Sequence, residues 1–175
     1  MQIIKTQNSN YHKDLSALYI EAFSTGLSTQ YIDIEKLNLY LNDILLNGYV
    51  LLAIDNEDVI GAILCCSLNM DNDLPNDISE KFTVDKCIYV AEIMVTEQAR
   101  GLGIGTKLLN EFFQTVDKSA FTDAFIRVWD ENVGAISLYK KVGFDEISTI
   151  EQSKKKADGK GTFVMKKIYL HKKLF

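Results

Sequence analysis

The stretch CIYVAEIMV at residues 87–95, followed closely by QARGLGIGT at residues 98–106, decides the fold of this chain. The first stretch is almost continuously apolar, as in a central strand covered on both faces, and a helical pattern follows at residues 103–118. At such a strand-to-helix turn, unpaired backbone N–H groups and the helix dipole favour an anion such as a pyrophosphate. Glycines let the backbone approach that anion closely. The segment therefore predicts an α/β fold with a phosphate-binding turn.

Other phosphate-binding motifs fit this turn less well. In the dinucleotide pattern GxGxxG, the third glycine after Gly101 and Gly103 would fall at position 106, which is Thr106. Asp123 has the spacing of a ribose-binding acid, but it begins the next predicted strand instead of ending it. The P-loop pattern GxxxxGK[ST] is absent. A turn that only lets the strand and helix pack remains as the structural alternative, and phosphate binding is the better interpretation.

The composition is that of one ordinary globular domain. The 175 residues are 47% hydrophobic and 25% charged, with one proline. Cys65, Cys66 and Cys87 fit neither a disulfide framework nor a CxxC zinc site, and we interpret them as reduced core thiols. No apolar leader follows Met1, and no stretch approaches the length of a membrane span. We therefore expect one domain over residues 1–175, in the cytoplasm, without a metal and without a membrane partner.

Charge is unevenly distributed along the chain. Residues 151–175 hold eight lysines against Glu151 and Asp158, so the net charge of −5 leaves the preceding residues strongly acidic. An acidic body is unfavourable for nucleic acid. It would attract cationic ligands such as amines, although a requirement for solubility explains it equally well.

Strands and helices are expected along the whole chain. Strands are expected at residues 2–7, 49–54, 59–68, 87–95, 123–129, 144–152 and 163–170, and helices near residues 15–22, 34–46, 103–118 and 133–142. Residues 69–86 are the best loop candidate. The order β-α-α-β-β-β-α-β-α-β-β predicts an α/β fold, with one mixed sheet and helices on both faces.

Two motifs resemble the coenzyme site of a known family. The pattern QxxGxG at residues 98–103 matches the pyrophosphate signature Q/R-x-x-G-x-G/A of the GNAT family of N-acetyltransferases. The pattern NxxAxxLYxxxGF at residues 132–144 is similar to the second half of that family's coenzyme site. The resemblance implies the GNAT-like acyl-CoA N-acyltransferase fold, with a sheet splayed between residues 87–95 and 123–129. It also implies acetyl transfer from acetyl-CoA to an amine.

By this resemblance, the glycine-rich turn and two other segments hold the coenzyme. The residues implied are Ile93, Met94, Val95, Gln98, Arg100, Gly101, Leu102, Gly103, Ile104, Gly105, Thr106, Asn132 and Tyr139. The extended backbone of residues 93–95 would bind the pantetheine arm, and an N–H there would stabilise the oxyanion of the tetrahedral intermediate. Asn132 would also contact pantetheine, but it fits equally well as the N-cap of the helix at residues 133–142.

Two side chains are candidates for proton transfer. An alkyl ammonium has a pKa of about 10, so only about one amine in a thousand is a free nucleophile at neutral pH. Glu92 is the lone charge in its strand and is our candidate general base through water, although a solvated strand end or a lysine partner explains it equally well. Tyr139 is our candidate general acid toward the departing thiolate, although Ile136, Tyr139 and Val142 also form an ordinary apolar stripe.

The acceptor and two rival functions stay open at this level. The acceptor is a primary amine of a small molecule or a protein N-terminus, and polyamines and aminoglycosides are among the compatible amines. A non-catalytic acetyl-CoA sensor is disfavoured by the presence of Glu92 and Tyr139, and a nucleotide-dependent oxidoreductase by the misplaced third glycine. No cysteine falls on a motif position, so we expect direct attack without a covalent enzyme intermediate. Homodimers are common in the family, but this sequence carries no signal for one.

Overall fold

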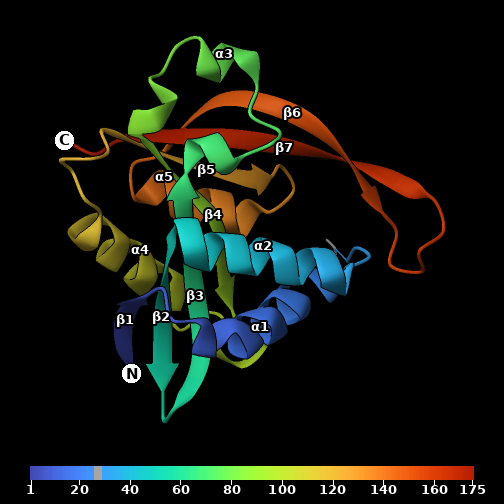
Figure 1. The fold of residues 1–175 in the computed structure, drawn as a ribbon. Helices are drawn as coiled ribbons and strands as arrows, with labels where there is room; N and C mark the ends of the chain where they lie inside the picture. Colours follow the sequence, from blue (N-terminus) through green and yellow to red (C-terminus); the bar gives the residue numbers. More distant parts are fainter. Residues whose placement is uncertain (26–28) are drawn as a thin grey trace.

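The computed structural model (Figure 1) describes residues 1–25 and 29–175. Its strands are β1 (Gln2–Thr6), β2 (Tyr49–Asp55), β3 (Asp58–Ser67), β4 (Cys87–Val95), β5 (Asp123–Trp129), β6 (Asp145–Lys155) and β7 (Thr162–Lys173). Its helices are α1 (His12–Ser24), α2 (Ile34–Asn47), α3 (Asn76–Ser79), α4 (Ile104–Thr115) and α5 (Val133–Lys141), with short 3₁₀ turns between several elements. Apart from α3, this is the predicted element order, and β4 and β5 have the predicted bounds.

The strands form one seven-stranded sheet in the order β1-β2-β3-β4-β5-β7-β6. Strands β4 and β5 are parallel, and the other neighbouring strands are antiparallel. A parallel pair needs a crossover, and the chain makes it through α4. The predicted mixed α/β sheet is therefore confirmed.

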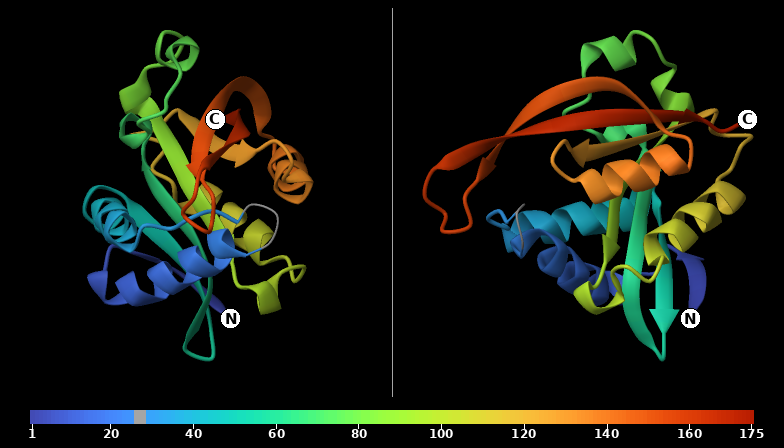
Figure 2. Two further views of the ribbon diagram at one scale, coloured as in Figure 1. Left: turned by 90° about the vertical axis from the view of Figure 1, so that its right-hand side faces the viewer. Right: turned by 180° about the vertical axis from the view of Figure 1, so that it is seen from behind.

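Two hydrophobic layers lie on opposite faces of the sheet. Helices α4 and α5 cover one face (Figure 2), where Leu109 and Phe112 are fully buried. Helices α1 and α2 cover the other face, where Leu15 and Leu41 are fully buried. Because a strand between two layers is apolar on both sides, the continuous apolar run of β4 is explained.

Two segments differ from the predicted structure. Helix α3 lies inside the predicted loop at residues 69–86, where it begins after Pro75 and buries Ile78, which is 1% exposed. A single buried apolar residue gives no periodicity, so the sequence pattern could not predict this helix. Strands β6 and β7 are longer than expected, because the pairs Lys154↔Phe163 and Lys155↔Thr162 continue the ladder into the lysine-rich stretch.

The tip of the β6–β7 hairpin lies against the segment between α1 and α2. The Tyr31 N–H donates a hydrogen bond of 3.0 Å to the Lys155 carbonyl oxygen, and the Lys155 Nζ lies 4.7 Å from the centre of the Tyr31 ring. The right-hand view of Figure 2 shows the hairpin reaching beyond the rest of the sheet toward this segment.

The cysteines are free and buried, as predicted for core thiols. Among the helices of the described residues, none combines the length and the apolar character needed to cross a membrane.

Candidate active site

The sheet splays between β4 and β5, as the sequence predicts. Their pairing ends at Val90↔Ile126, although the strands continue to Val95 and Trp129. A β-bulge lies at the point of separation, because Leu64 of β3 pairs with Glu92 and the next residue of β3 pairs with Val90. Bulges bend the strand that carries the extra residue. Beyond Val90, the backbone groups of β4 that face β5 have lost their strand partner and can bind a ligand.

A cavity of about 730 Å³ occupies the splay on the side of α4 and α5. It brings together most of the residues predicted to hold the coenzyme, namely Ile93, Met94, Val95, Arg100, Gly101, Gly103, Ile104, Gly105, Thr106, Asn132 and Tyr139. The predicted residues Gln98 and Leu102 do not line it, and Leu102 is 66% exposed. Phe23 of α1 and Trp129 of β5 do line it. Neither was foreseen, because neither belongs to a local motif.

The glycine-rich turn has a backbone that only glycine adopts without strain. Gly101 and Gly103 have φ angles of 78° and 77°, in the left-handed region. Gly103 is the N-cap of α4 and gives it no side-chain cap, so the first N–H groups of the helix stay available to an anion. Arg100 is held across the turn by a hydrogen bond of 3.3 Å from its Nε to the Val95 carbonyl oxygen. This geometry suits a pyrophosphate.

The second motif also lines the cavity. Asn132 caps α5 by accepting a hydrogen bond of 3.2 Å from the Ala135 N–H, so its predicted role as an N-cap is confirmed. Gly143 follows the helix with a φ of 91°. A Cβ on Gly105 would lie 3.2 Å from the Leu138 side chain, so α4 and α5 pack closely here. Whether Asn132 also contacts pantetheine stays a prediction.

Tyr139 lies where this cavity meets a smaller one of about 100 Å³. Its ring belongs to the core, since the residue is 6% exposed and the ring meets that of Phe144 edge-on. Within residues 1–25 and 29–175, its hydroxyl has no hydrogen-bond partner. Burial, and then the charge of Glu92, raise the pKa of Tyr139 above its usual value, so the hydroxyl is protonated at neutral pH. The core interpretation and the ligand-binding interpretation therefore both fit.

Glu92 lines the smaller cavity. The Tyr40 hydroxyl of α2 donates a hydrogen bond of 3.4 Å to its Oε1, and the carboxylate makes no ion pair with any described residue. Burial raises the pKa of Glu92 to about 7, and the charges of Lys167, Arg127 and Lys154 only partly offset this. A carboxylate with this pKa exchanges protons near neutral pH, as a general base must.

A buried network on the α1–α2 side of the sheet was not foreseen from the sequence. The Arg127 Nη1 donates to Asp71 Oδ1 at 3.0 Å, to Asp73 Oδ2 at 3.3 Å and to the Tyr169 hydroxyl at 2.9 Å. The Tyr169 hydroxyl donates to Asp71 Oδ2 at 2.7 Å, and Gln152 Nε2 donates to Asp73 Oδ2 at 2.5 Å. The network ties β5, β6 and β7 to the loop after β3. Its members are too far apart in sequence to form a motif.

Comparison with known proteins decides the family. The model of the acetyltransferase (GNAT) family matches residues 12–144. The chain belongs to the GNAT acetyltransferase family. The predicted resemblance is thereby confirmed, and the β6–β7 hairpin lies beyond the matched residues.

Individual GNAT proteins resemble this chain over different lengths. "Probable N-acetyltransferase san" of Drosophila melanogaster is 30% identical over 66% of the chain, and the match spans 57% of the Drosophila protein, less than two thirds of its length. A ribosomal-protein-alanine N-acetyltransferase from Brucella melitensis has the same fold, with a TM-score of 0.73, 20% identity and 99% coverage of both chains. The protein yncA of Salmonella typhimurium, solved with its cofactor acetyl-CoA, has a TM-score of 0.73 and 14% identity, with 100% and 95% of the two chains covered.

Proposed function

We propose that this GNAT protein is an acetyl-CoA-dependent N-acetyltransferase that acetylates a primary amine of a small molecule or a protein N-terminus. One observation carries the proposal. The cavity that begins at the glycine-rich turn ends at Tyr139, which also lines the smaller cavity that holds Glu92. A coenzyme bound along the first cavity would present its acetyl end to an acceptor bound in the second.

The residues of the splay suit acetyl-CoA. The left-handed turn at Gly101 and Gly103 offers N–H groups for the pyrophosphate, and the open edge of β4 offers backbone groups for the pantetheine arm. Among the described residues, no group of three or more His, Cys, Asp and Glu side chains is placed to hold a metal ion. We assign the coenzyme-binding role to the residues named from the motifs, with Gln98 and Leu102 as the least supported members.

Glu92 is the proposed base. With a pKa of about 7, it is unprotonated in a large fraction of molecules at neutral pH and can remove a proton from the acceptor amine, directly or through water. The amine nitrogen then attacks the thioester carbon, and the C–N bond forms. A free N–H of β4 beyond Val90 stabilises the oxyanion.

Tyr139 is the proposed acid. As the C–S bond breaks, its hydroxyl donates a proton to the sulfur of coenzyme A. Its raised pKa keeps the phenol protonated at neutral pH but widens the pKa gap to the thiol, so the position of the hydroxyl at the sulfur must drive the transfer. The buried cysteines take no part, because burial raises the pKa of Cys66 and Cys87 to about 12 and leaves them protonated.

Coenzyme A release, measured with acetyl-CoA and a panel of amines and peptides, tests this function. Tyr139→Phe should bind acetyl-CoA like the wild type in calorimetry but acetylate more slowly, whereas Tyr11→Phe, remote from both cavities, should match the wild type in both measurements. Tight binding without any turnover would favour the sensor hypothesis. No binding at all would refute the assignment of the cavity. Cytoplasmic location, a single domain and a homodimer remain predictions.

A further inference from the structure

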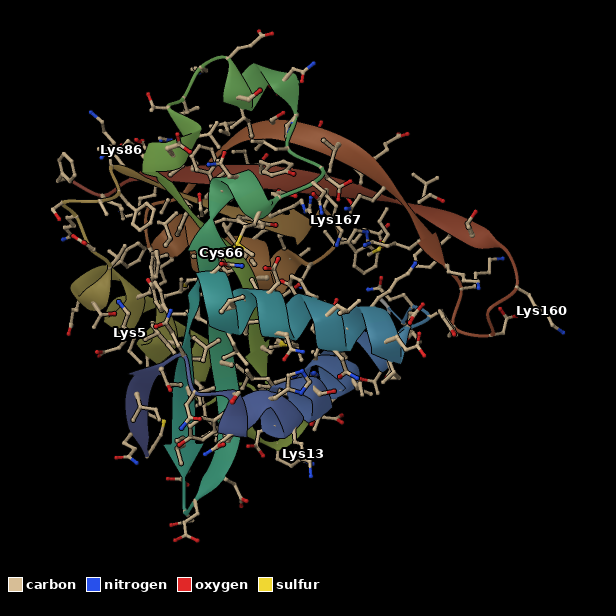
Figure 3. All side chains as sticks on the ribbon, viewed as in Figure 1. Lys5, Lys13, Cys66, Lys86, Lys160 and Lys167 are labelled. Atoms are coloured by element: carbon tan, nitrogen blue, oxygen red, sulfur yellow. The ribbon has the colours of Figure 1, made fainter. Side chains whose placement is uncertain are left out.

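The register of the sheet places three cationic side chains on the face that also carries Glu92. Lys167 of β7 pairs with Trp129 of β5, and Tyr169, two residues on, pairs with Arg127. Lys154 of β6 lies two residues beyond Gln152, which joins the network beside Arg127. Because side chains alternate along a strand, Arg127, Lys154 and Lys167 all point to the α1–α2 side. Figure 3 shows Lys167 between β7 and α2.

These three cations differ in how they are neutralised. Arg127 is paired with Asp71 and Asp73. Lys154 and Lys167 are half-buried, and neither forms an ion pair or a side-chain hydrogen bond with any residue that the structure describes. Burial of an unpaired charge is unfavourable, so a bound group of opposite charge would stabilise this arrangement. Lys167 lines the cavity of Glu92, so such a group would share that cavity with the acceptor amine.

The pKa values of the two lysines agree with their position as half-buried cations without an ion-pair partner among the described residues. Burial, and then the charge of Lys154, lower the pKa of Lys167 to about 8, despite the opposite charges of Glu92 and Asp130. Burial, and then the charge of Arg127, lower the pKa of Lys154. A second ammonium group in the cavity would meet these same cations, so a polyamine fits poorly.

We propose that the acceptor amine carries an anionic group, a carboxylate or a phosphate, which binds at Lys167 with Lys154 nearby while the amine lies at Glu92. This inference rests on the proposed function and narrows its acceptor class. The cations beside the acceptor decide which acceptors bind. The net negative charge of the whole chain has less influence, because it acts at long range and is screened by salt. The anionic group binds the side chain of Lys167, so a neutral amine of the same length loses this contact.

The test compares amines that differ only at the far end. The three probes 5-aminopentanoate, 5-aminopentanamide and 1,5-diaminopentane share a five-carbon chain and a primary amine, and end in a negative, a neutral and a positive group. We expect kcat/KM to be at least about tenfold higher for the acid than for the amide, and lowest for the diamine. A second pair, 3-aminopropyl phosphate and 3-aminopropanol, tests whether the anionic group is a phosphate instead of a carboxylate. A third pair, the peptides Ala-Asp and Ala-Asn, tests peptide acceptors in the same way.

Two variants test whether Lys167 causes the preference for the acid over the amide. Lys167→Met removes the charge and retains the length of the side chain, and it should reduce the acid-to-amide ratio to near one. Lys166→Met is the control, because Lys166 is exposed on the opposite face of the same strand, and it should leave the ratio unchanged. Thermal unfolding of each variant verifies that the fold is intact. An unchanged ratio in Lys167→Met would overturn the inference.

Failure of the inference and failure of the proposed function are distinguishable. If amines are acetylated but kcat/KM is no higher for the acid than for its neutral or cationic counterpart in every set of probes, the inference is wrong and the proposed function stands. If no amine is acetylated, calorimetry of 5-aminopentanoate with the coenzyme A-saturated protein decides. Binding that is lost in Lys167→Met supports the anion site without the enzyme function, and absence of binding overturns the inference.

Discussion

The coenzyme side and the proposed acceptor side of the splayed sheet are built in different ways. The coenzyme side consists mainly of backbone from one contiguous stretch, in which the bend of β4, the left-handed turn and the start of α4 follow one another. The proposed acceptor side consists of charged side chains from β4, β5, β6 and β7, and acids of the loop after β3 hold one of them, Arg127. Backbone geometry leaves local sequence signals, whereas a wall assembled from distant elements leaves none.

The largest expected effect lies at Glu92, where the two sides meet. Glu92→Gln removes the base, so kcat/KM at neutral pH should fall about 10²- to 10⁴-fold. In the wild type, kcat/KM should rise with pH and level off above about pH 7, because only the unprotonated carboxylate accepts the proton. In a pH profile of the variant, this rise of kcat/KM with pH should be absent, and the affinity for acetyl-CoA should be unchanged. A rise that persists would assign the base to another group.

The acceptor side should depend on its buried network. Asp71→Ala removes a nearly buried partner of Arg127, and the free energy of unfolding in urea should fall by about 3 kcal/mol, since breaking a buried ion pair leaves an uncompensated charge. Asp73→Ala is the matched change at a side chain that is 50% exposed, and it should cost under about 1 kcal/mol. Equal losses would contradict the distinction between the two acids.

Glu92 should also make stability depend on pH. Its pKa is raised in the folded state, so its stabilising contribution is present at acidic pH and is lost as the pH rises through about 7. Glu92→Gln should therefore be about 3 kcal/mol more stable than the wild type at pH 8, with no difference at pH 4. Chemical unfolding at both pH values measures this. A variant that is less stable at pH 8 would show that the carboxylate stabilises the fold when charged.

The coenzyme side should respond to backbone changes instead. Gly103→Ala forces a side chain into a left-handed conformation, at a cost of about 1–2 kcal/mol. If the turn relaxes to avoid this, the dissociation constant of acetyl-CoA should rise about 5- to 30-fold in calorimetry. Gly161→Ala is the matched control, because Gly161 has the same φ of 77° in the remote β6–β7 hairpin. It should lower stability and leave coenzyme affinity unchanged.

The smallest expected effect separates the two roles of Asn132. Asn132→Ala removes the cap of α5 and should lower stability by about 1 kcal/mol, whereas Asn132→Asp retains a capping oxygen and should be nearly neutral. Thermal unfolding tests the cap, and calorimetry with acetyl-CoA tests the contact. Weaker coenzyme binding in both variants would indicate that the amide itself binds the coenzyme.

Most of the fold could be predicted from the sequence. Strands β4 and β5 have the expected bounds because both are rich in apolar residues and are followed at once by a polar residue, Thr96 or Asp130. The splay and most of the coenzyme cavity followed from two local motifs. The failures were α3, which buries only Ile78, and the length of the hairpin, whose exposed lysines have no apolar alternation.

The proposed acceptor site was the least predictable part. Glu92 could be singled out because a lone charge in an apolar strand is conspicuous. The partial burial of Lys154 and Lys167 could not be predicted, because a lysine-rich stretch normally indicates a solvated surface. Their environment depends on the pairing of β6 with β7 and of β7 with β5, which joins segments that are distant along the chain.

The bulge in β4 makes chain length itself part of the active site. Odd and even positions of a strand supply different layers, and the extra residue at Ala91 exchanges the two sets from that point on. Deleting Ala91 would restore a regular ladder in which Glu92 keeps its layer, but it would remove the bend that separates β4 from β5. Substitutions at this strand change one group at a time, but a change of length alters the opening between the two strands.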